Sequence, residues 1–295
     1  MGIIKLWENR RGKPTLSFEF YPAHDEKSAL KLDKVVDSLV EFHPDFVSVT
    51  FGAGGTTREG SYELVKKLLE EKKQEVIGYI AAYGLTPQVL SSVLDSYKGL
   101  GVENILCIRG DKPAEEGEPV VLPETCFSHA SDFIEFVKPR YGFTIGAAGY
   151  PEGHLEAVDK ETDLNYLKLK VEKGAQFIIT QYSYDTNHYI KFVEKCRDAG
   201  IRVPIITGIM PIYTVKMMEN LARICGAKIT KELRDGLAAL PPDDKEAVTL
   251  FGMDYAYKQC KELIAYGVDG IHFYTMDRSG SVVAIVNRLR MEGLI

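Results

Sequence analysis

The sequence lacks several features that would assign it to a particular class of protein. Its five cysteines are odd in number and contain no Cys-X-X-Cys pair, so neither a disulfide framework nor a zinc knuckle is indicated. A net charge of −6 with no basic stripe argues against nucleic acid as a partner. No apolar run is long enough to span a membrane, and the first residues show no signal-peptide core. These absences together predict a reducing, cytoplasmic location.

What remains is the composition of an ordinary globular enzyme. Apolar residues make up 45% of the chain and charged residues 26%. The length of 295 residues fits a single α/β barrel. No linker rich in proline, glycine or serine divides the chain, so we expect one catalytic domain over residues 1–295.

Short runs rich in β-branched and aromatic residues alternate with segments of helical periodicity. In residues 61–73, for example, leucine and valine lie on one face, opposite lysine and glutamate. The eight predicted strands are residues 15–20, 45–51, 75–82, 104–109, 143–150, 176–182, 203–209 and 270–275. The helices predicted between and after them are residues 28–42, 61–73, 87–99, 128–140, 160–173, 187–199 and 281–292.

Eight strands that each precede a helix predict an α/β fold, a (β/α)8 TIM barrel. The interval between strands seven and eight is about twice the usual length of a βα unit. It contains three further helical segments, residues 214–226, 228–240 and 243–267, which we interpret as extra helices of the barrel. An open doubly wound sheet is the alternative, but no Gly-X-Gly-X-X-Gly follows the first strand.

Active sites of such barrels lie at the carboxyl ends of the strands. Glu19 stands between two phenylalanines there, a setting that favours the protonated carboxyl of a general acid; pairing with a barrel cation is the alternative. The six histidines are scattered, so no metal site is expected. The polar residues expected to converge on one mouth are Glu19, Thr50, Asp111, His154, Gln181 and Arg278.

Seven ordered segments give the chain a resemblance to a known family. They are SFEFYP (17–22), SVTFGAGGTTRE (48–59), CIRGDKP (107–113), GYPEGHLEA (149–157), ITQYSYD (179–185), VPIITGIMPI (203–212) and HFYTMDRS (272–279). Together they resemble the methylenetetrahydrofolate reductase family, in its short bacterial form with a catalytic barrel and no regulatory domain. Nearly the whole chain is covered by the resemblance.

The resemblance implies an oxidoreductase of one-carbon metabolism that serves methionine biosynthesis. Such a flavoprotein reduces 5,10-methylenetetrahydrofolate to 5-methyltetrahydrofolate with electrons from NADH or NADPH. Glu19 matches the family's general acid, and Asp111 the aspartate between flavin and pterin. Gln181 matches a glutamine that contacts folate and nicotinamide, and Arg278 an arginine suited to the glutamate tail of the substrate.

The resemblance also implies a set of flavin contacts. FAD is the expected cofactor. FMN is the alternative, because Tyr79, Tyr166 and Leu169 replace the family's usual histidine, asparagine and arginine. The implied contacts are Thr50, Phe51, Ala53, Tyr79, Arg109, Gly110, Asp111, Tyr150, His154, Ala157, Asp163 and Lys170.

The electron donor stays open at this point. Met217 and Leu221 stand where better-known members of the family have glutamine and phenylalanine. The second hypothesis is therefore a flavin-carrying subunit without its own NADH site, which receives electrons from a partner protein. A pterin-binding transferase and a cell-adhesion role for Arg109-Gly110-Asp111 rank lower. Homo-oligomers occur in the family, but no interface can be assigned from the sequence.

Overall fold

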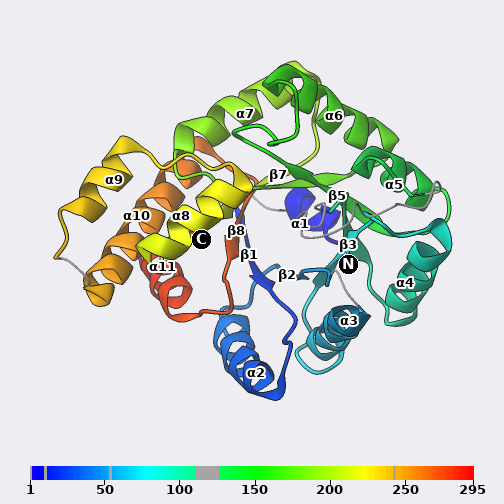
Figure 1. Cartoon of the computed structure of the whole chain (residues 1–295), viewed down its shortest axis with the longest axis horizontal. Helices are drawn as coiled ribbons and strands as arrows, with labels where there is room; N and C mark the ends of the chain where they lie inside the picture. The colour runs from blue at the N-terminus through cyan, green and yellow to red at the C-terminus, as the bar shows by residue number, and fades with distance from the viewer. Residues whose placement is uncertain (1, 10–11, 53–54, 111–125, 242–243) are drawn as a thin grey trace, which may run out of the picture.

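The computed structural model describes residues 2–9, 12–52, 55–110, 126–241 and 244–295, and its eight parallel strands form one closed barrel (Figure 1). Strand order around the barrel equals chain order, and β1 pairs with β8 to close it. The (β/α)8 prediction is confirmed. The strands are β1 Thr15–Phe20, β2 Phe46–Val49, β3 Val76–Ala81, β4 Asn104–Ile108, β5 Thr144–Gly149, β6 Phe177–Thr180, β7 Ile205–Ile209 and β8 Gly270–Tyr274.

The helices that follow the strands form an outer ring around the barrel (Figure 1). Three helices lie between β7 and β8, two more than one βα unit needs, as the long interval predicts. No helix among the described residues is both long and apolar enough to cross a lipid bilayer. The helices after β1 are α2 Glu26–Val40, α3 Gly55–Glu70, α4 Pro87–Gly99, α5 Ala130–Val137, α6 Lys160–Lys173, α7 Thr186–Asp198, α8 Val215–Cys225, α9 Lys231–Ala238, α10 Lys245–Tyr266 and α11 Gly280–Met291.

One helix precedes the first strand and was not predicted. Helix α1, Ile4–Asn9, carries Trp7 to the rings of Phe46 and Phe177, at centroid distances of 6.3 and 5.8 Å. These two rings belong to an apolar cluster inside the barrel. Six residues are too few for a visible amphipathic period, so only the barrel interior gives α1 a partner.

The single domain over residues 1–295 stays a prediction.

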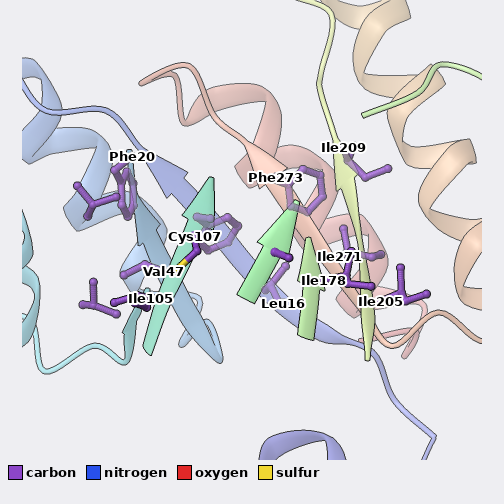
Figure 2. Close-up of a cluster of buried hydrophobic side chains, with 14 of the residues drawn as sticks. Leu16, Phe20, Val47, Ile105, Cys107, Ile178, Ile205, Ile209, Ile271 and Phe273 are labelled. Atoms are coloured by element: carbon purple, nitrogen blue, oxygen red, sulfur yellow. The ribbon is translucent and has the colours of Figure 1, made fainter. Parts of the chain in front are cut away.

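Each strand has two faces, because successive side chains of a strand point to opposite sides. The outward face packs against the helices and forms the larger apolar cluster, which includes Phe20, Cys107 and Phe273 (Figure 2). The inward face is smaller and mixed in chemistry. On β1 it carries Ser17 and Glu19, which are both buried.

Glycines on the inward face make room for large rings from neighbouring strands. A Cβ atom on Gly146 would lie 2.3 Å from the Phe177 ring. A Cβ atom on Gly208 would lie 2.4 Å from the ring of Tyr274, whose hydroxyl donates to the Thr180 carbonyl at 2.8 Å. Large side chains opposite glycines thus fill the barrel as packed layers rather than as a pore.

Candidate active site

The turn after β4 shows why the charged tripeptide of residues 109–111 contains glycine. Gly110 has φ +89, a conformation that L side chains rarely adopt, and a Cβ there would lie 3.1 Å from Ala81. Before this turn, the Arg109 carbonyl accepts a bond from the Tyr83 amide at 2.6 Å. The pairing of β3 with β4 therefore extends to Arg109, at the carboxyl end of the barrel.

Glu19 lies inside the barrel near this same end and is only 2% exposed. Its Oε2 atom has no hydrogen-bond partner, although it is buried. The carboxyl contributes to raising the pKa values of Tyr21, Tyr79 and Tyr274 above the ordinary tyrosine value, after the larger effect of burial. These phenols therefore stay neutral around the Glu19 carboxyl.

The prediction that Phe18 and Phe20 form the surroundings of the Glu19 carboxyl is wrong. Phe18 and Phe20 are neighbours in sequence, but they lie on the outward face, in the cluster between barrel and helices. Alternation along β1 turns Glu19 to the opposite side. Its aromatic surroundings come instead from other strands, with Tyr79 on β3 and Tyr274 on β8.

A second part of the site is a pocket of about 260 Å³ beside the ends of β4 and β5, bounded by α5 and α6. Arg109 donates two hydrogen bonds to Glu156 there, from Nη1 to Oε2 at 2.7 Å and from Nη2 to Oε1 at 2.8 Å. The Lys170 Nζ donates to the Ala148 carbonyl at 3.0 Å. The predicted flavin residues that line this pocket are Arg109, Tyr150, His154, Ala157, Asp163 and Lys170.

Burial shifts the pKa values of the ionisable groups in this pocket. Desolvation lowers the pKa of Lys170 to about 8, against the raising effect of Asp163. Desolvation and the Arg109 charge also lower the pKa of His154, whereas burial raises that of Asp163. Asp163 accepts a hydrogen bond from the His154 amide at 3.2 Å, which fixes the loop to α6. The pocket therefore offers cationic and neutral donors to an anion.

Other predicted residues lie at the strand ends around the mouth. Thr50 is held through its carbonyl, which accepts from the Ser61 hydroxyl at 2.9 Å, and Phe51 is half-buried beside it. Gln181 follows β6 directly, and its backbone N–H donates to the Gly149 carbonyl at 2.8 Å. Tyr79 lies deeper, inside the barrel at 7% exposure. Two predicted residues, Ala53 and Asp111, lie outside the described residues.

Arg278 is exposed and follows an unusual turn. Met276 and Asp277 both have positive φ angles, 49° and 51°, which cost energy in residues other than glycine. The Tyr21 amide donates to Asp277 at 3.2 Å, which holds this turn against the end of β1. The Arg278 guanidinium carbon lies 5.1 Å from the centroid of the Tyr213 ring, and this cation–π contact holds the side chain at the rim.

Two contributors were not singled out from the sequence. Glu156 pairs with Arg109 across 47 positions of the chain. His272 is fully buried, with its Nε2 atom 3.7 Å from Oε2 of Glu19. The sequence contained a signal for His272. It is a polar residue within an otherwise apolar strand, as Ser17 and Glu19 are in the first strand.

The residues of the pocket fit the diphosphate of a flavin dinucleotide in their chemistry. An arginine fork, a lysine ammonium and a histidine ring are donors that suit phosphate oxygens. Arg109, His154 and Lys170 would hold the phosphates, and the pocket adjoins the strands that carry the mouth residues. Among the described residues no group of three or more acidic, histidine or cysteine side chains is placed to hold a metal.

The family of the chain follows from comparison with known proteins. The family model described as methylenetetrahydrofolate reductase matches residues 5–290. The chain belongs to the methylenetetrahydrofolate reductase family. The 5,10-methylenetetrahydrofolate reductase of Escherichia coli K12 is 33% identical over 282 residues, which are 95% of this chain and 92% of that protein.

Other relatives in the family are longer. Methylenetetrahydrofolate reductase (NADH) 1 of Arabidopsis thaliana is 34% identical over 292 residues, 95% of this chain but 49% of the plant protein. The chain spans about half the length of the first plant and fission-yeast relatives that it matches.

Solved structures share the fold at low sequence identity. An uncharacterized protein from Clostridium thermocellum, described as binding two copies of 5-methyl-5,6,7,8-tetrahydrofolic acid, aligns with a TM-score of 0.65 and 16% identity. The alignment covers 98% of this chain and 99% of that one. At this identity the likeness supports the barrel fold alone.

Proposed function

We propose that this protein is a flavin-dependent reductase that converts 5,10-methylenetetrahydrofolate to 5-methyltetrahydrofolate. The observation that carries the proposal is Glu19, a carboxyl that is 2% exposed and has a buried oxygen without a hydrogen-bond partner. A buried polar atom of this kind costs free energy unless a ligand or a proton satisfies it. Family membership supplies the substrate class.

Reduction requires that the five-membered ring of the substrate first opens. In the proposed reaction the bond between the methylene carbon and N10 breaks, and N10 takes a proton from Glu19 Oε2. The methylene carbon, now an iminium carbon, accepts a hydride and becomes the methyl group. Reduced flavin, as FAD with FMN as the alternative, supplies that hydride when bound.

The remaining residues bind and orient. Gln181 and Arg278 are proposed to contact the folate, with the exposed Arg278 guanidinium on its glutamate tail. Arg109, His154 and Lys170 are proposed to hold the flavin phosphates, with Thr50, Phe51, Tyr150, Ala157 and Asp163 shaping the rest of the cofactor site. Asp111, proposed to bind the pterin, and Ala53, Tyr79 and Gly110 complete the set. A cytoplasmic location belongs to the same proposal.

Separate measurement of the two half-reactions tests the role of Glu19. Glu19→Gln keeps the shape of the side chain but removes the acidic proton. We expect stopped-flow oxidation of the reduced flavin by methylenetetrahydrofolate to slow roughly 10²- to 10⁴-fold. Flavin reduction by NADH or NADPH should keep its wild-type rate. Folate turnover near the wild-type rate in Glu19→Gln would disprove the acid role.

A second candidate function concerns the electron donor. Leu221 packs against the apolar cluster around Tyr182 and Met210, and Met217 lies in the first turn of α8. Met217 lacks the amide of the glutamine, and Leu221 lacks the aromatic ring of the phenylalanine, that better-known members of the family have at these positions. The chain would then be a flavin-carrying subunit supplied by a partner protein. Rapid NADH or NADPH oxidation by the isolated chain would reject this candidate.

A further inference from the structure

His272 lies inside the barrel next to Glu19, two residues before the β8 residue that pairs with Glu19, and is fully buried. In the register of β1 with β8, Ser17 is opposite His272 and Glu19 is opposite Tyr274. The His272 Nε2 atom is 3.7 Å from Oε2 of Glu19, the oxygen that has no hydrogen-bond partner. This separation is too long for a hydrogen bond, but a small rotation of the carboxyl would close it.

The hydrogen bonds of Ser17 indicate which nitrogen of His272 carries its proton. The Ser17 hydroxyl lies 3.2 Å from the Ile271 carbonyl, which can only accept, so the hydroxyl proton is used there. Ser17 Oγ is also 2.9 Å from His272 Nδ1 and must then accept from it. In a neutral ring Nδ1 is therefore the protonated nitrogen, and Nε2 presents a lone pair towards Glu19 and the Ser48 hydroxyl.

The rest of the ring is held by packing. His272 stacks on Phe46 with a centroid distance of 6.1 Å and an interplanar angle of 15°, and meets the edge of Tyr274 at 5.2 Å. A fully buried imidazole between two aromatic rings has little freedom to turn. The direction of its Nε2 lone pair is thus fixed by the barrel.

We infer that His272, as a neutral imidazole, is a positioning residue that holds Glu19 in its proton-bearing form and orients the carboxyl for the folate reaction. An inward lone pair repels a carboxylate oxygen but accepts a hydrogen bond from a protonated carboxyl. The ring therefore favours the form of Glu19 that can give a proton to the substrate. This inference rests on the proposed function of Glu19 as the acid.

Two substitutions separate this role from a structural one. In His272→Gln the side-chain amide reaches the position of Nε2, so a polar group still faces Glu19. In His272→Asn the amide takes the position of Nδ1, so the contact with Ser17 is kept and the one with Glu19 is lost. Both remove the stacked ring, and thermal unfolding should show similar losses of stability for the two.

We expect His272→Asn to slow the folate half-reaction about ten- to hundredfold, because the rotated Glu19 carboxyl would lose the hydrogen bond that it makes to Nε2. His272→Gln should keep a larger share of the rate. The flavin half-reaction and the dissociation constant of folate should stay unchanged in both. Equal losses in the two variants, or a greater loss in His272→Gln, would overturn the inference.

A spectroscopic readout keeps this test independent of turnover. The infrared band of a protonated Glu19 carboxyl can be assigned by its absence in Glu19→Gln. We expect the band to shift or vanish in His272→Asn and to remain in His272→Gln; an unchanged band in both variants contradicts the inference. Where both variants fold poorly, Ser17→Ala should change the band, because the Nδ1–H group of His272 then loses its hydrogen-bond acceptor. A wild-type protein that does not reduce folate refutes the proposed function, whereas the infrared comparison still decides the role of His272.

Discussion

Lys170 should make flavin binding depend on pH in a range where few other groups of the pocket titrate. Burial lowers the pKa of its ammonium group to about 8 in the protein without cofactor. A lysine with a lowered pKa is charged below that value and neutral above it. If its charge holds the cofactor phosphates, affinity must fall as the pH rises through 8.

The size of the effect follows from the charged fraction. With a pKa of about 8, roughly nine-tenths of Lys170 is charged at pH 7 and roughly one-tenth at pH 9. The affinity for FAD should therefore fall about tenfold between these values. His154 has a lowered pKa and is already neutral over this interval, and the raised pKa of Cys107 keeps its thiol neutral. Asp163 and Arg109, the charged groups that face Lys170, keep their charge throughout.

The assay is a titration of the apoprotein with FAD, followed by quenching of flavin fluorescence at pH 7, 8 and 9. Lys170→Arg is the matched control, because arginine stays charged over the whole interval and should remove the pH dependence. Lys170→Met should bind weakly at every pH. An affinity that is constant with pH in the wild type, or a slope that persists in Lys170→Arg, would refute the reasoning.

Three further predictions concern packing and the substrate. Gly208→Ala should lower the free energy of unfolding by about 1–3 kcal/mol, because its Cβ would overlap the Tyr274 ring; Gly99→Ala, in open space, is the control in urea denaturation. Trp7→Ala should cost about 3 kcal/mol in the same measurement, and no loss would show that α1 does not support the barrel. Arg278→Ala should raise the folate KM about tenfold without slowing flavin reduction, and an unchanged KM would exclude the tail contact.

The barrel was predictable because its pattern is local. Alternation of strands and helices, and the long interval before β8, follow from periods of 2 and 3.6 along the chain. Helix α1 escaped this reading, because its stability comes from the barrel interior that Trp7 contacts and not from its own six residues.

For the site, the sequence by itself determined which polar residues end the strands, because parallel strands bring their carboxyl ends to one side. Only the tertiary structure decided which of them meet. It turned Glu19 away from its neighbour Phe18 and towards His272, 253 positions later, and it paired Arg109 with Glu156. Such contacts depend on strand register and barrel closure, which are properties of the assembled sheet and not of any single segment.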